Sequence, residues 1–585
     1  MTMRIVTIRR ISQFFFFAMF VWFCIVSTVG EQFWRLRGWP INWLLQLDPL
    51  VAIGSILTTH KLYWPLLWAL PVVIITIIFG RFFCSWVCPF GSIHHFAGFA
   101  AHRKKPASKR IQLNRYRKAQ RIKYFVLVFV LATAAFPSIA ATLQTALLDP
   151  IPLLTRSFNL AVLPLLDRPA NLASPADRFY EGAWVILAIF TAAVLLNLVV
   201  PRFYCRFICP LGALFAVLSR FAIWRIGKNQ HPCSDCRLCE KACEGACQPS
   251  QKIRISECVL CFNCRADCKD ESISYQTKPS LAGEITDSDI SRRGFVLSLA
   301  GGILAVPALR LGNKLGSNFS AAMIRPPGAL DEERFLKRCI KCGQCMRVCP
   351  TNVIQPAGID AGIEGLWTPV LNNRIGSSGC QLNCVACGQV CPTAAIRPIS
   401  LPEKLGTDDF AAAGPIRIGT AFIDQGRCLP WAMDKPCIVC QENCPVSPKA
   451  ICTREVFNTI RDGVYTVKNA STKTVQTLEQ MPGLDKFATG DYYCLTDGGE
   501  LRKITANTGS SIEISDDEPF EQVPALGGGI KIQIRLQRPF IDIEKCIGCG
   551  VCEHECPVSG KKAVRVSAEG QTRSTKTALL LERLK

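Results

Sequence analysis

The sequence predicts a multidomain chain in which a four-helix transmembrane domain, built as a tandem two-helix repeat, precedes small α+β modules rich in cysteine. Three observations support this fold class. The chain has 585 residues, more than one hydrophobic core usually organises, and 49% of them are hydrophobic. Four long apolar segments lie within the first 200 residues. Most of the 32 cysteines follow these segments in closely spaced groups.

The four apolar segments are predicted membrane spans, because each approaches the ~20 residues needed to cross hydrocarbon. They are residues 11–30, 62–80, 124–147 and 183–200. The first lacks a cleavage site of the A-x-A type, so we expect an uncleaved helix and not a signal peptide.

Basic residues account for the formal net charge of +22 and cluster beside the predicted spans, at 4–10, 103–123 and 202–228. The positive-inside rule assigns these flanks to the cytoplasm, together with the N-terminus. We therefore interpret the charge as a topology signal and predict no nucleic-acid partner.

Two helix pairs repeat within this domain. An Asp-Pro turn precedes the second and the fourth span, and a C-x-x-x-C-P turn follows each of them. These turns contain Asp48, Cys84 and Cys88 in the first copy and Asp149, Cys205 and Cys209 in the second. The repeat predicts that both Asp-Pro turns lie outside and both cysteine turns lie inside.

The later cysteines follow a C-x-x-C-x-x-C-x-x-x-C pattern, which is typical of thiolates that surround an iron–sulfur cluster. Zinc ligands come instead as two separated pairs. The first two motifs contain Cys233, Cys236, Cys239, Cys243 and Cys247, then Cys258, Cys261, Cys264 and Cys268. In two-cluster ferredoxins the fourth cysteine of one motif binds the other cluster. Cys268 is therefore predicted to complete the first cluster and either Cys243 or Cys247 the second, because Glu244 stands where Pro usually follows.

Four further motifs predict four more clusters, six [4Fe–4S] clusters in all. Their ligands are Cys339, Cys342, Cys345 and Cys349; Cys380, Cys384, Cys387 and Cys391; Cys428, Cys437, Cys440 and Cys444; and Cys546, Cys549, Cys552 and Cys556. The spacing leaves open which motifs exchange their fourth cysteine. Between the third and fourth of these motifs, residues 457–539 alternate apolar and polar residues and predict small β structure.

The four thiols of the Cys-Pro turns are predicted to meet at one face of the membrane domain. They could hold iron or a further iron–sulfur cluster within the membrane, and the alternative is structural thiols or a redox-active dithiol. Cys24, Cys452 and Cys494 lack partners at cluster spacing and are expected to be buried thiols.

Asp48 and Asp149 are candidate proton acceptors of a quinol site, since ionisable groups at a membrane boundary are usually functional. The alternative is that they cap helices at the Asp-Pro turns. His94 and His95 follow the first Cys-Pro turn, and we expect an interfacial polar pair in preference to haem ligands.

The expected domains are residues 1–228, the transmembrane domain; 229–278, a ferredoxin-like module with two [4Fe–4S] clusters; 279–323, a linker; and 324–585, a ferredoxin-like domain with four clusters. Within the linker, Ser291-Arg292-Arg293-Gly294-Phe295-Val296 and an apolar run to Leu309 are similar to a twin-arginine export signal. This run predicts a fifth span, and the alternative is a buried or interfacial helix.

Residues 1–275 resemble the NapH-type membrane quinol-dehydrogenase subunit of periplasmic nitrate reduction, through the paired Cys-Pro turns, the Asp-Pro turns and the two-cluster tail. Residues 291–585 are similar to its partner, the NapG-type four-cluster protein. The stretches that carry this second resemblance are the twin-arginine segment, Arg325-Pro326-Pro327-Gly328-Ala329, Cys428-Leu429-Pro430-Trp431 and Cys444-Pro445-Val446-Ser447-Pro448-Lys449-Ala450. The chain therefore looks like a natural fusion of the two subunits, apart from residues 457–539.

The resemblance implies the electron-transfer subunit of a quinol dehydrogenase complex in the cytoplasmic membrane of a bacterium or archaeon. Membrane lipid and the quinone pool would be its surroundings, and a periplasmic reductase, a cytochrome or a membrane haem subunit its redox partners. The C-terminal domain would lie in the periplasm. One alternative is a relay from a cytoplasmic ferredoxin or flavoprotein to quinone or the periplasm. Another is an accessory electron donor for the maturation or regulation of a metalloenzyme.

This topology raises a difficulty, because the first module lies inside and the four-cluster domain outside. The hydrocarbon between them is ~30 Å thick. A quinone, a partner haem or another cofactor would have to fill that gap.

Overall fold

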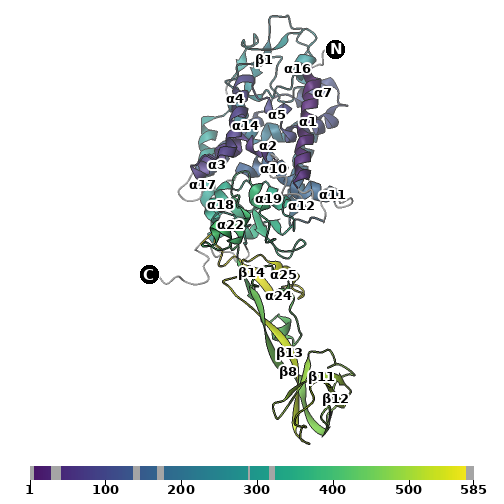
Figure 1. Cartoon of the computed structure of the whole chain (residues 1–585). Helices are drawn as coiled ribbons and strands as arrows, with labels where there is room; N and C mark the ends of the chain where they lie inside the picture. The colour runs from purple at the N-terminus through teal and green to yellow at the C-terminus, as the bar shows by residue number, and fades with distance from the viewer. Residues whose placement is uncertain are drawn as a thin grey trace. The chain divides into compact units, whose positions relative to one another are not determined.

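The computed structural model describes residues 5–27, 41–135, 145–167, 177–286, 290–314 and 323–574. The chain divides into two compact units (Figure 1). The first comprises Met1–Asn372, Asn383–Ile416 and Arg573–Lys576, and the second comprises Asn373–Leu382, Arg417–Thr572 and Thr577–Lys585.

Two successive series of helices, here called the helical domain, form the first part of the first unit. The first series is α1 (Ile5–Val26), α2 (Trp43–Gln46), α3 (Pro49–Thr59), η2 (Trp64–Trp68), α4 (Ala69–Phe79), α5 (Phe83–Trp86) and α6 (Pro89–His102). α7 (Ala107–Leu113) and η3 (Lys118–Arg121) connect it to the second. The second is α8 (Ile122–Ala135), α9 (Thr145–Leu148), α10 (Pro150–Ser157), η4 (Phe158–Val162), α11 (Leu163–Asp167), α12 (Ala183–Leu195), η5 (Leu196–Leu198), α13 (Phe203–Phe207) and α14 (Pro210–Ser219). The structural repeat thus contains more short helices than the sequence repeat predicts.

Equivalent helices of the two series begin in the same way. α3 and α10 start with the Pro of an Asp-Pro turn, and α6 and α14 with the Pro of a Cys-Pro turn. Proline suits this first position because its missing N–H would have no helical partner there. The Asp48 carboxylate caps α3 by accepting from the Leu50 amide at 2.9 Å. The Cys88 and Cys209 sulfurs cap α6 and α14, accepting from Gly91 N and Gly212 N at 3.4 and 3.1 Å.

Among the described residues, one helix is long and apolar enough to cross a membrane by length and composition, and it is α1. It begins at Ile5, earlier than the predicted start, because Ile5 and Val6 pack against the cysteine-rich module that follows. Shorter apolar helices cover Pro49–Thr59, Trp64–Phe79, Ala183–Leu198 and Pro210–Ser219. The predicted four-span domain is therefore not confirmed. Residues 28–30 and 136–144 of two predicted spans lie outside the described residues.

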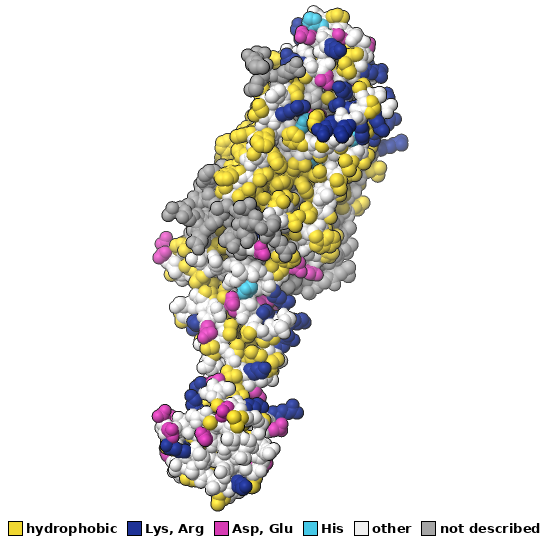
Figure 2. All heavy atoms as spheres, turned by 90° about the vertical axis from the view of Figure 1, so that its right-hand side faces the viewer, with side chains coloured by type: hydrophobic (Ala, Val, Ile, Leu, Met, Phe, Trp, Pro, Cys, Tyr) yellow, Lys and Arg dark blue, Asp and Glu magenta, His cyan; other side chains and the backbone are white. Residues whose placement is uncertain are grey.

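Large apolar side chains are exposed around the middle of the helical domain, where Figure 2 shows a broad hydrophobic face bordered by a cluster of Lys and Arg. Three tryptophans are among the most exposed of these side chains: Trp64 at 77%, Trp184 at 75% and Trp68 at 64%. Contiguous apolar surface of this kind is unusual on a protein surrounded by water and typical of a membrane or protein contact.

The module that follows the helical domain, here called the first module, spans Arg225–Ile285. It contains the antiparallel pair β1 (Arg225–Lys228) and β3 (Ile273–Gln276), the parallel pair β2 (Ile253–Arg254) and β4 (Glu284–Ile285), and the short helices α15 (Leu238–Lys241), η6 (Ile255–Glu257) and α16 (Asn263–Ala266). Its apolar core includes Ile226, Ile253, Leu260 and several cysteines.

Helix α17 (Arg292–Lys314) contains the twin-arginine segment and packs on α8. A Cβ on Gly294 would meet the Phe125 ring at 2.6 Å, and a Cβ on Gly302 would meet Phe129 O and Ala132 Cβ at 2.7 Å. The two helices therefore run in the same direction in close contact, which small residues permit.

The remainder of the first unit, here called the third-motif segment, comprises residues 323–372 and 383–416. It contains α18 (Glu332–Arg338), α19 (Gln344–Arg347), β5 (Ile354–Pro356), η7 (Ile359–Ala361), α20 (Gly362–Gly365), β6 (Pro369–Leu371), α21 (Ala386–Gln389), α22 (Leu401–Leu405) and η8 (Asp408–Phe410). β5 and β6 pair antiparallel.

The second unit combines a compact cysteine-rich part with a β-barrel. The cysteine-rich part has the antiparallel pair β7 (Thr420–Ile423) and β14 (Val564–Ser567) and helices α23 (Leu429–Ala432), α24 (Val439–Glu442) and α25 (Val551–Glu555). A long ribbon of β8 (Ile451–Ala470) and β13 (Gly529–Ile541) extends from it.

This ribbon closes with β9 (Thr474–Thr477), β10 (Tyr492–Thr496), β11 (Leu501–Asn507) and β12 (Ser511–Ile514) into a barrel of order β10-β11-β12-β9-β8-β13 (Figure 1). Alternate residues of β13, Ile530, Ile532 and Ile534, are buried inside it. The predicted β structure is present, but its two long strands extend beyond residues 457–539, since they continue directly from the cysteine-rich part.

Candidate electron-transfer site

The first module brings its two cysteine motifs together. The Cys239 thiol interacts electrostatically with Cys243, Cys268 and Cys233. The Cys264 thiol interacts with Cys261, Cys258, Cys243 and Cys239. Cys268 therefore lies with the first motif, in the exchanged arrangement that two-cluster ferredoxins use.

Cys243 and Cys247 lie together beside the second motif. Their sulfurs are 3.4 Å apart, and both thiols act electrostatically on Cys258. The choice between Cys243 and Cys247 as the fourth ligand of the second set therefore stays open.

A small cavity in the third-motif segment is lined by four cysteines from two motifs: Cys339, Cys342, Cys345 and Cys391. The amide of Ile396 donates to the Cys391 sulfur at 3.5 Å. Four converging thiols in an apolar cavity, with a peptide N–H directed at one sulfur, fit a [4Fe–4S] cluster, because clusters take thiolate ligands and peptide hydrogen bonds to the sulfurs tune them.

The second unit brings the cysteines of two motifs close together, as an exchange of fourth cysteines would require. Burial raises the pKa of the Cys440 thiol to about 12, and the neighbouring Cys437, Cys428 and Cys556 thiols act in the same direction. Burial likewise raises the pKa of Cys552, with Cys549, Cys546, Cys440 and Cys444 as its neighbours. Cys556 thus lies near the Cys428–Cys440 set, and Cys444 lies near the Cys546–Cys552 set.

The remaining motif is divided between the units. Cys384, Cys387 and Cys391 belong to the first unit, whereas Cys380 belongs to the second. In the second unit the Cys380 amide donates to the Cys549 carbonyl at 2.7 Å. The cluster predicted for this motif stays a prediction.

The four thiols of the Cys-Pro turns lie near one another, at what we call the Cys-Pro end of the helical domain. Cys209 interacts electrostatically with Cys205, Cys84 and Cys88, and Cys88 with Cys84 and Cys205. Two glycines make room for this, because a Cβ on Gly91 would meet Cys84 O at 2.4 Å and one on Gly212 the Cys209 sulfur at 3.2 Å.

Among the described residues, no three His, Cys, Asp or Glu side chains converge closely enough to hold a single metal ion. This holds for the ferredoxin-like sets as well as for the Cys-Pro thiols, so the iron or iron–sulfur site predicted at the Cys-Pro turns stays a prediction.

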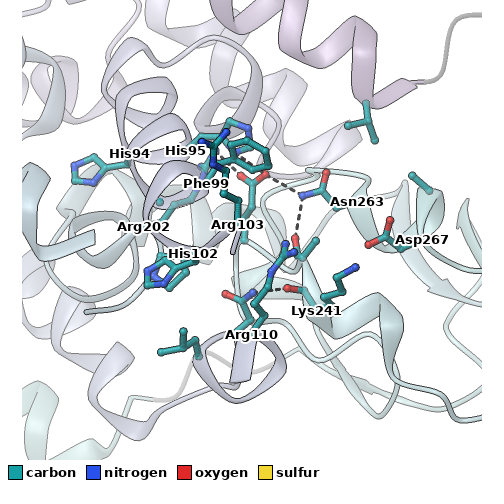
Figure 3. Close-up of a pocket in the computed structure, with 18 of the residues that line it drawn as sticks. His94, His95, Phe99, His102, Arg103, Arg110, Arg202, Lys241, Asn263 and Asp267 are labelled. Atoms are coloured by element: carbon teal, nitrogen blue, oxygen red, sulfur yellow. Dashed lines mark hydrogen bonds and ion pairs between the residues drawn. The ribbon is translucent and has the colours of Figure 1, made fainter. Parts of the chain in front are cut away.

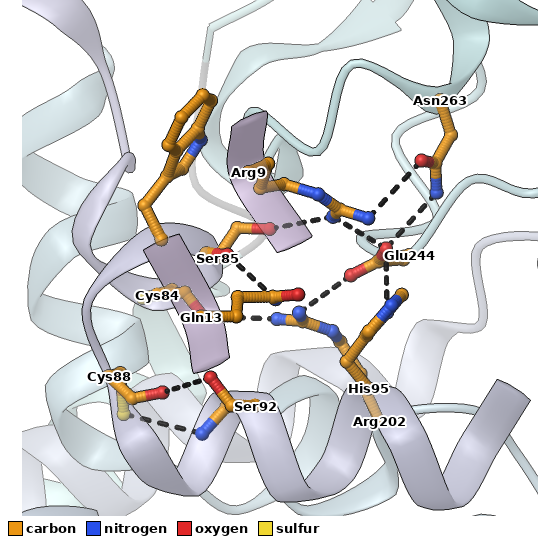
Figure 4. A network of polar contacts seen from close by, with 12 residues as sticks. Arg9, Gln13, Cys84, Ser85, Cys88, Ser92, His95, Arg202, Glu244 and Asn263 are labelled. Atoms are coloured by element: carbon orange, nitrogen blue, oxygen red, sulfur yellow. Dashed lines mark hydrogen bonds and ion pairs between the residues drawn. The ribbon is translucent and has the colours of Figure 1, made fainter. Parts of the chain in front are cut away.

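A buried ionic network joins the Cys-Pro end to the first module (Figure 4). The Glu244 carboxylate pairs with Arg9 at 2.6 Å, with Arg202 at 2.6 Å and with His95 at 2.9 Å. Burial alone would raise the pKa of Glu244, but Arg202, Arg9 and His95 outweigh it and hold the pKa well below its usual range. Arg202 also donates to Cys84 O at 3.1 Å and interacts electrostatically with Cys261.

A second network lies beside it. Glu257 accepts from Lys123 and, at 2.9 Å, from the Tyr124 hydroxyl. Burial opposes ionisation of Glu257, yet Lys123 and Arg81 lower its pKa. Arg81 in turn donates to Ser256 O at 2.7 Å. The first module is therefore fixed to the helical domain by compensated buried charges.

The opposite end of the helical domain, the Asp-Pro end, is organised differently. Asp48 and Asp149 are both fully buried, and each carboxyl group acts on the ionisation of the other. Two carboxylates this close would repel each other, which favours protonation of one of them. Asp48 is thus a helix cap as well as a member of this pair, whereas the Asp149 side chain caps no helix.

Tyr204 and Arg156 connect this pair to thiols on both sides. Tyr204 interacts electrostatically with Cys209, Asp149 and Arg156. Arg156, which is 0% exposed, interacts with Cys342 and Cys339 and donates to Lys341 O at 3.3 Å. These side chains thus lie between the Cys-Pro thiols and the third-motif cavity.

The third-motif segment packs directly against the helical domain at the Asp-Pro end. Ile340 and Cys342 belong to the same apolar core as α3, α10 and α14. The Asn159 amide donates to Gln344 Oε1 at 3.2 Å, and a Cβ on Gly343 would meet Leu160 at 3.2 Å. One cysteine set therefore lies at each end of the helical domain.

The sequence did not identify Glu244, Arg202, Arg156 or Tyr204 as functional residues. Glu244 could have been noticed in the sequence, because it occupies the place of the usual Pro after Cys243. Arg156 could have been noticed as a charged residue in an apolar stretch. His95 pairs with Glu244, and His94 Nδ1 lies 2.6 Å from the Asn197 amide nitrogen, so the two buried histidines make separate polar contacts.

Family comparisons identify iron–sulfur modules along the chain. A family described as a 4Fe-4S binding domain matches residues 62–108 and 183–229, and each match includes one Cys-Pro turn. A 4Fe-4S dicluster domain matches residues 338–395, and a further 4Fe-4S binding domain matches residues 537–558. No solved structure matches the chain.

Two ferredoxin-type proteins and a regulatory protein are among those similar in sequence. Ferredoxin-type protein NapH of Escherichia coli is 28% identical over 47% of this chain and 90% of its own length. Regulatory protein NosR of Pseudomonas aeruginosa is 26% identical over 38% of this chain, which covers only 30% of NosR. Ferredoxin-type protein NapG of E. coli is 30% identical over 29% of this chain and 68% of its own length.

These relatives and α1 are consistent with association with a membrane. The matched modules and the converging thiols identify iron–sulfur clusters as the cofactors and redox proteins as the partners. The chain is an iron–sulfur electron-transfer protein, and it belongs to the family of ferredoxin-type proteins that includes NapG.

Proposed function

We propose that this chain is a fused quinol dehydrogenase subunit that conducts electrons through its helical domain, from one membrane face to the other, and delivers them to a reductase or cytochrome. The observation that carries the proposal is the line of thiols and buried side chains inside the first unit. It runs from Cys261 through Arg202 to the Cys-Pro thiols, then through Tyr204 and Arg156 to Cys342.

The Cys-Pro thiols are the central step of this line. The matched 4Fe-4S family supports a cluster at these thiols, because its two matches contain the two turns. Such a cluster would supply a one-electron carrier between the two ends and would fill the gap that the predicted topology leaves. The chain's own contribution is to leave room for the thiols at Gly91 and Gly212 and to place Arg202 and Arg81 beside Cys84.

Oxidation of a quinol releases two electrons and two protons, so the site needs a proton acceptor near the electron path. Asp48 and Asp149 are the candidates, because both carboxyl groups are buried, each acts on the ionisation of the other, and Asp149 also acts on Tyr204. Two carboxylates this close repel each other, so the pair favours the uptake of a proton.

The proposed topology places the first module in the cytoplasm and the four-cluster part outside. α17 supports it, because this helix begins beside Phe125, near the start of α8, and contacts α20 of the third-motif segment. An electron that moves outward from a negative interior gains ~2.3 kcal/mol per 100 mV. The membrane potential would therefore assist flow toward the outside.

Replacing Cys84 and Cys209 by Ser tests the proposal. In the purified full chain we expect the loss of one cluster signal in electron paramagnetic resonance and the loss of quinol-driven reduction of the remaining clusters. Dithionite should still reduce the ferredoxin-like sets. Cys24→Ser is the matched control, since Cys24 is a buried thiol of α1 that belongs to no set. Unchanged cluster content in C84S/C209S would show that the Cys-Pro thiols hold no cluster.

Sidedness is tested separately, by thiol labelling or protease treatment of sealed right-side-out spheroplasts. Labelling of the C-terminal unit from outside supports delivery to a periplasmic reductase or cytochrome. Protection would favour exchange with a cytoplasmic ferredoxin or flavoprotein.

The name of NosR favours a second candidate, an electron donor in the regulation or maturation of a metalloenzyme. Stoichiometric co-purification with a catalytic reductase would exclude it.

A further inference from the structure

A cavity of about 270 Å³ opens at the Cys-Pro end, between α1, α6, α7 and the first module (Figure 3). Its charged lining is strongly basic. The cationic side chains are Arg10, Arg103, Arg110, Arg202 and Lys241, and the carboxylates are Glu244 and Asp267. Three histidines, His94, His95 and His102, also line it.

The two carboxylates do not neutralise this lining. Glu244 is already paired with Arg9, Arg202 and His95. Within the part of the chain that the structure describes, no ion pair is formed by Arg10, Arg103, Arg110 or Lys241. Four cations therefore face Asp267 alone, and the cavity favours an anion that carries more than one acceptor oxygen.

Apolar surface continues from the cavity along the helical domain. The Phe99 ring lines the cavity and lies 5.8 Å from the Arg10 guanidinium. Beside it, Phe96 on α6 is 45% exposed and Ile11 on α1 is 53% exposed. The basic cluster borders the hydrophobic face in Figure 2. A ligand with an anionic head and a hydrocarbon tail matches both surfaces.

We propose that this cavity binds the phosphate group of an anionic phospholipid, such as phosphatidylglycerol, with its acyl chains on the apolar surface of α1 and α6. Basic pockets at the cytoplasmic side of membrane helices bind such head groups. Arg10 lies on α1, Arg103 directly follows α6, Arg110 lies on α7, and Lys241 belongs to the first module. One phosphate group would therefore join three parts of the first unit. The inference rests on the membrane location in the proposed function and not on quinol oxidation.

The test is lipid retention by the full holoprotein. Protein in nanodiscs of phosphatidylcholine with a minor fraction of phosphatidylglycerol is extracted, and the retained lipid is measured by native mass spectrometry. We expect selective retention of phosphatidylglycerol, reduced about tenfold or more in R103Q/R110Q, since each basic residue near the membrane surface contributes ~1 kcal/mol. K104Q/K109Q is the matched control, because it removes the same charge from the same loop at exposed positions outside the cavity.

Equal retention by R103Q/R110Q would overturn the inference. Binding of inorganic phosphate without selective retention of phosphatidylglycerol would also overturn it, in favour of a soluble phosphate-bearing ligand. Loss of co-purified quinone instead of phospholipid in R103Q/R110Q would show that the cavity is a quinone site. Iron content and absorbance of the clusters establish that each variant is folded, and quinol-driven cluster reduction in the same samples tests the proposed function independently.

Discussion

At the Cys-Pro end of the helical domain, each buried carboxylate meets cations, whereas at the Asp-Pro end two carboxyl groups meet each other. Glu244 is surrounded by Arg9, Arg202 and His95. The Asp48 carboxyl group acts on the ionisation of Asp149, and neither carboxyl oxygen of Asp149 has a hydrogen-bond partner among the described residues. Both ends bury ionisable groups, but only the first compensates them.

The difference separates a structural role, the attachment of the first module to the helical domain, from a chemical role in proton transfer. A compensated carboxylate is fixed in one charge state and is suited to joining two parts of a protein. Two uncompensated carboxyl groups close together titrate as a pair and can take up or release a proton, which is what proton-coupled oxidation of a quinol requires. Removing the carboxyl group at each end tests whether the two roles differ.

The largest effect is expected for Glu244→Ala. This change leaves Arg9 and Arg202 buried without a counter-charge, and breaking a buried pair in this way costs about 3–5 kcal/mol. We expect a large fall in thermal stability and release of the first module on limited proteolysis. Glu284→Ala is the control in the same module, because Glu284 pairs with one partly exposed cation, Arg225. Equal effects of the two changes would contradict a special role of Glu244.

Asp149→Asn should act on activity in preference to stability. Asn keeps the size and polarity of the side chain but cannot accept the proton, and loss of a general base typically lowers a rate by a factor of about 10² or more. Quinol-driven cluster reduction should fall accordingly, while reduction by dithionite and thermal stability stay near the wild type. Asp360→Asn, at an exposed position, is the control. An unaffected quinol reaction would assign the Asp pair to helix capping and packing.

This contrast also shows what the sequence could predict. Spacing within about ten residues predicts a local cysteine motif, because a short turn must place its thiols around one centre. The same spacing cannot say that Cys444 lies near Cys546, Cys549 and Cys552, since that depends on how distant segments fold together. That Cys268 lies with the first motif could be predicted, because two-cluster ferredoxins repeatedly exchange their fourth cysteines.

The buried charges were harder to predict, because their meaning depends on partners far away in the sequence. Arg9 and Glu244 are separated by 235 residues, so neither looks like part of a site by itself. The short helices α2, α3, α9 and α10 were missed for a related reason. Their apolar residues pack against the rest of the helical domain, and at this length tertiary packing decides helix formation more than local propensity.

A smaller effect is expected for Arg156→Gln, which removes a buried positive charge at the Asp-Pro end. Arg156 places a positive charge near Cys339 and Cys342. A positive charge favours the reduced state of a nearby cluster, so its removal should lower the reduction potential of the cluster held there, by about 30–60 mV. A redox titration followed by electron paramagnetic resonance measures this shift. Arg334→Gln on α18, whose side chain is 76% exposed, should leave the potential unchanged.

The smallest effect concerns Glu332, a compensated carboxylate in the third-motif segment. Burial alone would raise its pKa, but the guanidinium groups of Arg325 and Arg573 lower it from 4.5 to about 2. A carboxylate with a lowered pKa stabilises the folded chain above its unfolded pKa and loses that contribution as the pH falls through its folded pKa. The Glu332 side chain is 36% exposed, so solvent screening limits the contribution to about 1 kcal/mol.

Glu332→Gln should therefore be slightly less stable than the wild type at pH 7, and the difference should disappear between about pH 4.5 and pH 2. Denaturant unfolding of both proteins across this range measures it, with Glu403→Gln as the control for a carboxylate paired with an exposed arginine. A difference that persists below pH 2 would show that Glu332 acts through packing and not through its charge. In that case compensation of charge would be confined to the Cys-Pro end, where Glu244 and Glu257 attach the first module.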